Sequence, residues 1–404
     1  MTKKYRPSEL LDEMLNAENF LIIQDVDGVC IPLVKDPLTR KLDLSYIESA
    51  SLLKEEFAVL TNGEHAGYRG LNRVIRNSYI NESKSPSEGK YLPGLAAGGI
   101  EYQNRFGEVS YPGVTRKELD FLSKIPVEMQ KLLKESLQKI LVDLKEDQIE
   151  SLSRTAVLET RFSPTINLNK VFSKIPNDLG LQREVQSSIN NIMNRILEFS
   201  KESGLENSFF LHIAPNLGKT NGKEELKYAC EGDVGTTDIQ FMLSGSLKES
   251  GLLVLLNKYL EAKNGKSPFG DNFNVRNAPK SIIELKDLCL EKIQDSQMPM
   301  LIGIGDTVTS NHSEDGKEWL RGGSDRGFLT LIQELGKQYS KDNKVVLVDS
   351  SGGEVDRPSL STKDLKGISD PYDPLKFNTL FSDGPSSYIN WFNKLAEARI
   401  KKQR

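Results

Sequence analysis

The residues best suited to chemistry are two aspartates, Asp25 and Asp27, which follow the apolar run Phe20–Ile23 in the motif DVDGV. Side chains two residues apart in an extended chain point the same way, so both carboxylates should face one spot at the strand's end. Open α/β sheets bind their ligands at that edge. A calcium loop of the EF-hand type does not fit, because Gly28 stands at its fourth position. The pair therefore favours a Mg²⁺ site with nucleophilic and acid–base chemistry.

A third aspartate, Asp306, ends another buried apolar run, Met300–Gly305. A dinucleotide-binding turn is disfavoured here, because Val308 stands where the third glycine of that motif would be. An acid at the tip of a buried strand is better suited to hold a metal ion. Asp306 is therefore expected to join the first two aspartates at one edge of the sheet.

Two further residues add groups that a phosphoryl transfer needs. Thr61 ends the apolar run Phe57–Leu60, and Lys280 begins a helix that leads into the strand before Asp306. Phosphoryl transfer requires an in-line nucleophile, a shared cation and fixed donors for the developing charge. We expect Asp25 to be the nucleophile and Asp27 the general acid and base. Thr61 would donate hydrogen bonds, Lys280 would neutralise charge, and Asp25, Asp27 and Asp306 would hold the metal.

The elements that must position these residues are arranged as an interrupted α/β fold. Apolar strands alternate with helices near both ends of the chain, which is typical of a doubly wound, Rossmann-like parallel sheet. Between them the pattern predicts a helix, two strands, a second helix and two strands, at 118–147, 153–162, 165–168, 181–201, 208–213 and 225–230. This order predicts an inserted α+β domain. We expect core segments at 1–112 and 272–404 and the insert at 113–271.

Composition excludes several classes of protein. The 404 residues carry 53 Lys and Arg against 57 Asp and Glu, which does not fit a protein that mainly grips nucleic acid. No apolar run approaches the length of a membrane span, and the N-terminus is charged throughout, so we expect no membrane partner and a cytoplasmic location. Three scattered cysteines and three scattered histidines predict neither disulfides nor a zinc site.

The four motifs resemble those of the haloacid dehalogenase superfamily of phosphatases, in family order. They are DVDGV at 25–29, Thr61, Lys280 within PKSIIEL at 279–285, and Gly305-Asp306. The resemblance implies a Mg²⁺-dependent phosphatase that forms an aspartyl-phosphate, with the insert as a large cap that selects the substrate. Relatives usually carry a second acid about four residues after the fourth-motif aspartate. Here Thr309, Ser310 and Asn311 occupy those positions, and one of them or Asp315 would have to replace it.

A narrower resemblance is carried by DVDGVCIPLVKDPLTR at 25–40, LTNGEH at 60–65 and RGGSDRG at 321–327. These segments resemble the glucosylglycerol-phosphate phosphatases of cyanobacteria, which act in osmolyte synthesis and salt tolerance. The resemblance implies glucosylglycerol phosphate as the substrate and a functional link to the matching synthase. The residues themselves leave open a phosphatase for trehalose or sucrose phosphate, a phosphosugar mutase, and a catalytically inactive regulator that binds a phosphosugar.

Substrate-binding candidates fall in two places. Asn62, Glu64, His65 and Arg69 come just after Thr61 and should lie close to the phosphate. In the insert, polar residues on or near the strands are candidates to bind sugar hydroxyls, namely Arg161 and His212.

Overall fold

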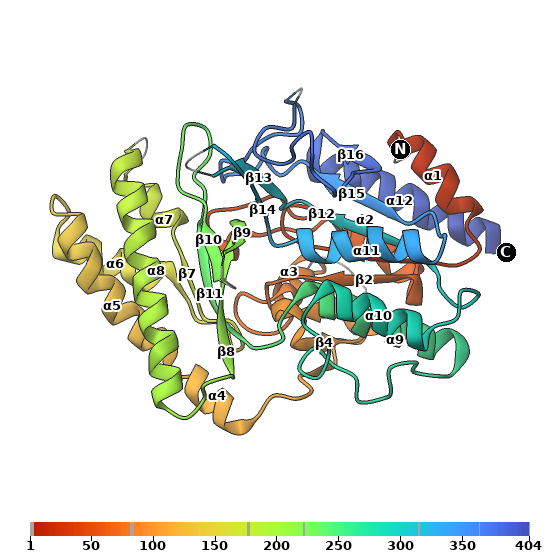
Figure 1. The fold of residues 1–404 in the computed structure, drawn as a ribbon, viewed down its shortest axis with the longest axis horizontal. Helices are drawn as coiled ribbons and strands as arrows, with labels where there is room; N and C mark the ends of the chain where they lie inside the picture. Colours follow the sequence, from red (N-terminus) through yellow and green to blue (C-terminus); the bar gives the residue numbers. More distant parts are fainter. Residues whose placement is uncertain are drawn as a thin grey trace.

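The computed structural model describes residues 4–80, 85–175, 178–220, 223–313, 316–362 and 364–403. Two main sheets divide the chain into a core and a cap, which lie side by side in Figure 1. The core strands, in chain order, are β1 (Phe20–Gln24), β2 (Phe57–Leu60), β3 (Gly94–Ala96), β4 (Glu101–Gln103), β5 (Val109–Ser110), β12 (Met300–Gly305), β15 (Lys344–Val348) and β16 (Thr379–Phe381).

The core sheet has the strand order β16-β15-β12-β1-β2-β3-β4-β5. From β16 to β3 the neighbours are parallel, and the last two strands form an antiparallel margin. After β1 the chain first builds strands on one side of it and later returns to build β12 on the other. The strand order therefore reverses between β1 and β12, which is where doubly wound sheets bind ligands. The α/β core predicted from the sequence is confirmed.

Alternate residues of β1 enter two separate layers of packing. Phe20 and Ile22 are buried with the helices on one face, whereas Leu21 and Ile23 are buried with those on the other. The helices of the first face are α1 (Pro7–Asn16), α2 (Leu44–Leu52), α3 (Leu71–Ser78) and α12 (Gly384–Gln403). Those of the second are α9 (Lys248–Asn264), α10 (Ile282–Lys292) and α11 (Arg326–Gln338). Among the described residues, no helix is both long and apolar enough to cross a bilayer.

The cap has a second sheet of order β6-β7-β11-β8. Its strands are β6 (Val157–Leu158), β7 (Thr165–Asn167), β8 (Phe209–Ala214) and β11 (Asp238–Leu243), with the hairpin β9 (Asn216–Thr220) and β10 (Lys223–Leu226). Its helices are α4 (Arg116–Leu122), α5 (Ile125–Ile140), α6 (Glu146–Ala156), α7 (Asn169–Phe172) and α8 (Leu179–Glu202). Ile166, Ile239 and Phe241 pack in the cap core, and the polar residues that alternate with them line the cavity between cap and core.

Several sequence-based boundaries need correction. The predicted helix at 118–147 is three helices, and the predicted strand at 153–162 is only β6, because α6 continues through Ala156. The predicted strand at 225–230 ends at Leu226, and the cap's central strand β11 was not predicted. α9, which the boundary at 271 assigned to the insert, packs against β1, β2 and β3. By its packing α9 belongs to the core.

Candidate active site

The site is built around Asp25, which directly follows β1 at the reversal of strand order. Its side chain is 10% exposed. One oxygen accepts a hydrogen bond from the Val26 N–H at 2.7 Å, and the other lies 2.6 Å from Lys248 Nζ. Burial raises the pKa of Asp25 to about 7, against the attraction of Lys248, and Asp325 adds to the rise. A nearby cation would favour the ionised form that a nucleophile needs.

Lys248 supplies the positive charge at this site. It is the first residue of α9, and its side chain is buried between Asp25 Oδ2 and Asp325 Oδ1, each 2.6 Å from Nζ. The prediction that Lys280 has this role is wrong: Lys280 is exposed two residues before α10 and does not line the cavity at Asp25. Lys248 was missed because its helix is buried on nearly every side and shows no amphipathic period.

Asp25, Asp306 and Asp325 form an acidic cluster whose carboxylate oxygens lie within 4.8 Å of one another. With one lysine among them, two negative charges are left for a divalent cation to balance. Asp306 Oδ2 is buried without a hydrogen-bond partner, as expected of a metal ligand. Burial and the two other aspartates raise the pKa of Asp306 well above its ordinary value. The donor set therefore fits a hard cation held by oxygen.

Asp325 takes the place of the second acid that was sought near Asp306. One of its oxygens contacts Lys248, and the other accepts the backbone N–H groups of Asp306 and Thr307, each at 2.9 Å. It therefore fixes both the lysine and the end of β12. The hairpin of β13 (Thr309–His312) and β14 (Trp319–Gly322) separates it from Asp306 along the chain, which hid it from spacing arguments.

The other candidates for that second acid lie elsewhere. On β13, Thr309 Oγ1 donates to the Asn216 carbonyl and Ser310 Oγ to Asp370. Asn311 is the next residue of the same strand and is not in the acidic cluster. Asp315 lies outside the described residues.

Asp27 faces the cavity but stands apart from the acidic cluster. Its carboxylate, 34% exposed, pairs with the buried Arg40, whose Nη1 lies 2.9 Å away. Arg40 also donates to the backbone carbonyls of Pro37 and Arg69. The carboxylate of Asp27 is thus placed for proton exchange and not among the grouped metal ligands, unlike its predicted role as a ligand. Arg40 ends the segment 25–40 that carries the narrower resemblance, but it was not singled out as a site residue.

A cavity of about 210 Å³ lies above these groups, between core and cap. Four residues of the turn after β2 line it as predicted, namely Thr61, Asn62, Glu64 and Arg69. The cap contributes Thr165 and Asn167 from β7 and Asp238 and Gln240 from β11. Asp238 and Gln240 were missed because β11 itself was missed, whereas Thr165 and Asn167 lie on a predicted strand but were not singled out.

Glu64 joins the turn after β2 to the cap. Its Oε1 accepts a hydrogen bond from the Phe162 N–H at 2.9 Å. Burial raises the pKa of this carboxyl to about 8. Glu64 therefore combines a contact to the cap with a place on the cavity wall.

Three predicted substrate-binding residues do not line this cavity: His65, Arg161 and His212. His65 is fully buried between the Gly94 carbonyl and Gln103, where burial lowers its pKa to about 4. Arg161 lies over the Tyr111 ring and lines a neighbouring groove together with Glu64 and Arg69. His212 points at Asn62, with 3.0 Å between Nε2 and Nδ2.

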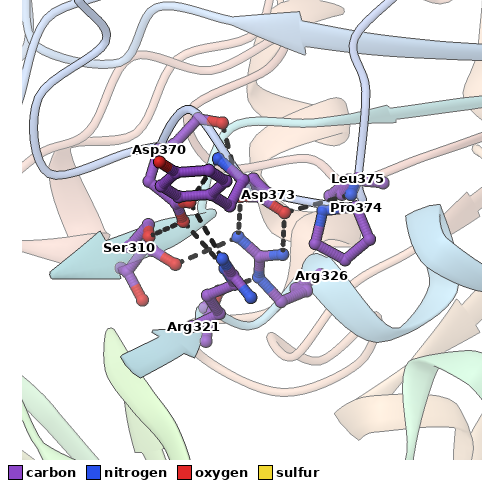
Figure 2. Close-up of polar contacts among 12 residues, drawn as sticks. Ser310, Arg321, Arg326, Asp370, Asp373, Pro374 and Leu375 are labelled. Atoms are coloured by element: carbon purple, nitrogen blue, oxygen red, sulfur yellow. Dashed lines mark hydrogen bonds and ion pairs between the residues drawn. The ribbon is translucent and has the colours of Figure 1, made fainter. Parts of the chain in front are cut away.

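The segment between β15 and β16 adds Val355 and Arg357 to the cavity wall. Arg357 donates to the Gly235 carbonyl and to Thr237 Oγ1 of the cap, each at 3.0 Å. Figure 2 shows what anchors this segment: two arginines from the β14–α11 region pair with two of its buried aspartates, as Arg321 with Asp370 and Arg326 with Asp373.

The chain matches a known protein family over nearly its whole length. The glucosylglycerol-phosphate phosphatase family model matches residues 19–396. A glucosylglycerol-phosphate phosphatase from Synechocystis sp. is 42% identical over 398 residues, which cover 96% of this chain and 94% of that protein.

Solved structures resembling the chain include a trehalose-6-phosphate phosphatase of Aspergillus fumigatus, at 10% identity and a TM-score of 0.40, covering 98% of this chain and 100% of that one. The C-terminal domain of trehalose-6-phosphate phosphatase from C. albicans matches at 11% identity and a TM-score of 0.45, covering 98% of each chain. The match of the family model over nearly the whole length, together with the 42% identical relative, shows that the chain belongs to the glucosylglycerol-phosphate phosphatase family, whose members are phosphoric monoester hydrolases.

Proposed function

We propose that this chain hydrolyses glucosylglycerol phosphate to glucosylglycerol and inorganic phosphate through an aspartyl-phosphate on Asp25. The observation that carries the proposal is the 2.6 Å contact of the buried Lys248 with Asp25, which lines the cavity between core and cap. The substrate is supported by the 42% identical relative of that name. The released osmolyte gives the protein a role in salt tolerance.

Asp25 and the charged residues near it each have a defined task in this reaction. A carboxylate oxygen of Asp25 attacks phosphorus in line with the ester oxygen, and the phosphorus–ester bond breaks. Asp27 gives a proton to the leaving alkoxide. It then takes a proton from water, whose oxygen attacks the aspartyl-phosphate and returns Asp25 to its carboxylate form. Lys248 balances the negative charge that builds up on the phosphoryl oxygens. Arg40 orients Asp27.

Mg²⁺ is the cation we propose for the acidic cluster. Asp25 and Asp306 would hold it, and Asp325, which is engaged by Lys248 and two backbone N–H groups, lies beside them. When bound, it supplies positive charge to the phosphoryl oxygens. The buried Asp306 Oδ2, which lacks a partner, supports this assignment.

The test is phosphate release from a panel of sugar phosphates, including those of glucosylglycerol, trehalose and sucrose, with and without Mg²⁺. The expected result is selective turnover of glucosylglycerol phosphate that stops in Asp25→Asn. Thermal unfolding gives a second readout: Mg²⁺ should raise the melting temperature of the wild type and not of Asp306→Asn, because binding to the folded state stabilises it.

Other outcomes of the panel identify the alternatives. Preference for trehalose or sucrose phosphate would keep the mechanism and discard the substrate. Conversion of a sugar phosphate to its isomer without phosphate release would indicate a mutase. Binding of a sugar phosphate with no turnover of any ester would indicate a catalytically inactive regulator. The functional link to the synthase and the cytoplasmic location stay predictions.

A further inference from the structure

The turn after β2 contacts the cap at two points. Glu64 accepts the Phe162 N–H from the β6–β7 loop, and Asn62 contacts His212 of β8. Between them lies the backbone of Gly63, whose N–H donates to Thr61 Oγ1 at 3.3 Å. The part of the core closest to the reacting phosphate is therefore held by the cap.

His212 is itself held by a buried carboxylate. Its Nδ1 lies 3.0 Å from Glu224 Oε2 of β10, and both side chains are at most 11% exposed. Glu224 also accepts the Ile213 N–H at 2.7 Å and the Asn216 amide at 3.2 Å. Against the effect of burial, the contact with His212 and the hydrogen bond from the Ile213 N–H hold the pKa of Glu224 below its ordinary value. Glu224 is therefore an ionised acceptor.

An ionised acceptor at Nδ1 determines the tautomer of the ring. A neutral His212 then carries its proton on Nδ1, which leaves Nε2 as an acceptor. The group opposite Nε2 must be a donor, so the Asn62 amide points its Nδ2 toward the cap. The amide has a second N–H and a carbonyl oxygen besides this bond. Asn62 also lines the cavity that contains Asp25, whereas His212 lines only a neighbouring one.

We propose that His212 is a positioning residue: the chain Glu224–His212–Asn62 fixes the Asn62 amide from the cap, so that its remaining polar atoms face the phosphoryl group. His212 then acts without touching the substrate, in contrast to the substrate-binding role predicted from the sequence. The inference rests on the proposed function as a phosphomonoesterase. It makes correct placement of the cap a condition for fast turnover, because the core turn alone does not fix the amide.

The test uses steady-state kinetics of the full chain on the best ester of the panel. His212→Ala should lower kcat about 10- to 100-fold and change KM less than about threefold, since loss of orientation acts on the reacting state. His212→Gln, whose amide oxygen can accept from Asn62 Nδ2, should recover most of kcat. The double variant Asn62→Ala/His212→Ala should be no slower than Asn62→Ala alone, because both remove one interaction.

Glu225→Gln is the matched control for Glu224→Gln, the variant that removes the carboxylate next to His212. Both residues are on β10, but neighbouring side chains of a strand point to opposite faces, so only Glu224 reaches His212. The proposal is overturned if the effects of His212→Ala and Asn62→Ala multiply, or if kcat is unchanged. A raised KM at unchanged kcat would place His212 on the substrate.

A measurement without turnover separates this proposal from the proposed function. Nitrogen NMR of ¹⁵N-histidine-labelled protein should find His212 protonated on Nδ1, with an Nε2 resonance that shifts in Asn62→Ala. His212→Gln assigns the signal among the three histidines. Protonation on Nε2, or no shift in Asn62→Ala, overturns the proposal even in an active enzyme. The expected spectrum from a chain that hydrolyses no ester would disprove the phosphatase function and leave the contact standing.

Discussion

Lys248 is the residue whose replacement has the clearest expected effect. Its ammonium lies between Asp25 and Asp325, so Lys248→Ala leaves close, buried carboxylates without their cation. We expect phosphate release to fall at least about 10³-fold, because charge stabilisation at the phosphoryl group and the position of Asp25 are lost together. The measurement is kcat/KM with the preferred ester at saturating Mg²⁺.

Lys280→Ala is the comparison that separates this lysine from the one predicted by spacing. Lys280 is exposed and outside the cavity, so its loss should change kcat/KM less than about twofold. A severe loss in Lys280→Ala with retained activity in Lys248→Ala would contradict the site described above. Melting temperatures of both variants show whether a loss of activity comes from unfolding.

The raised pKa of Glu64 predicts that the stability of the fold depends on pH. Burial raises the pKa of its carboxyl from 4.5 to about 8, so the folded chain keeps a proton that the unfolded chain releases. Stability is therefore lost as the pH rises from about 4.5 through about 8. The shift corresponds to at most about 5 kcal/mol. Glu64→Gln, which can still accept from the Phe162 N–H, should flatten this part of the profile.

The check is thermal unfolding of wild type and Glu64→Gln between pH 5 and 8.5. The two melting temperatures should differ little at pH 5, and the variant should be the more stable at pH 8.5. Glu159→Gln, at an exposed position of the neighbouring groove, should follow the wild type. Parallel profiles for wild type and Glu64→Gln would show that Glu64 is ionised in the folded chain.

Helix α9 is the element that sets the depth of Lys248. Gly251, one turn after Lys248, faces β2 so closely that an added Cβ would lie 2.7 Å from Leu60 Cδ1. Gly251→Val should therefore push the start of α9 away from the sheet, costing about 1–3 kcal/mol of stability. Because Lys248 would move with the helix, kcat should fall as well.

Gly180→Val is the control for this substitution. Gly180 is also in the first turns of a helix, α8, but its added Cβ would meet only Asp178 Oδ1, at 3.4 Å. It should leave kcat unchanged. Equal stability and activity in the Gly251 and Gly180 variants would mean that α9 does not control the lysine.

The same elements explain what could be predicted from the sequence. Asp25, Thr61 and Asp306 follow short, mostly apolar strands, and such strands must lie side by side in a parallel sheet. The pattern of apolar strands alone therefore predicted that these three residues lie at one edge of the sheet. Lys248 begins a helix that is buried on most sides, so its sequence shows no amphipathic period. Asp325 is brought next to Asp306 only by the β13–β14 hairpin. The contact of Asn62 with His212 depends on how the cap docks, which no local pattern encodes.

At the scale of the whole molecule, the segment between β15 and β16 links core and cap. It contributes Val355 and Arg357 to the cavity, and Arg357 reaches two groups of the cap. The segment is anchored through Asp373, which accepts both terminal nitrogens of Arg326 at 2.7 and 2.9 Å (Figure 2). We therefore expect substrate binding to depend on an ion pair outside the cavity wall.

Asp373→Asn tests this dependence. Asp373 is fully buried and the Arg326 side chain is 13% exposed, so the variant leaves a largely buried guanidinium without its counter-charge. We expect a loss of about 3 kcal/mol in the free energy of unfolding. A loosened segment should raise KM more than it lowers kcat. Arg357 lines the cavity on the side of this segment, whereas the groups that carry out phosphoryl transfer lie at Asp25. Chemical denaturation and steady-state kinetics measure the two effects.

The control is Glu334→Gln, which removes the partner of Lys337 on the same helix, α11. That pair is exposed, with 30% and 59% of the two side chains accessible, so its loss should cost less than about 1 kcal/mol and leave KM unchanged. If Asp373→Asn is destabilised while KM stays at the wild-type value, the segment stabilises the fold without shaping the site. A rise in KM specific to Asp373→Asn would show that sugar recognition extends from the cap into this part of the core.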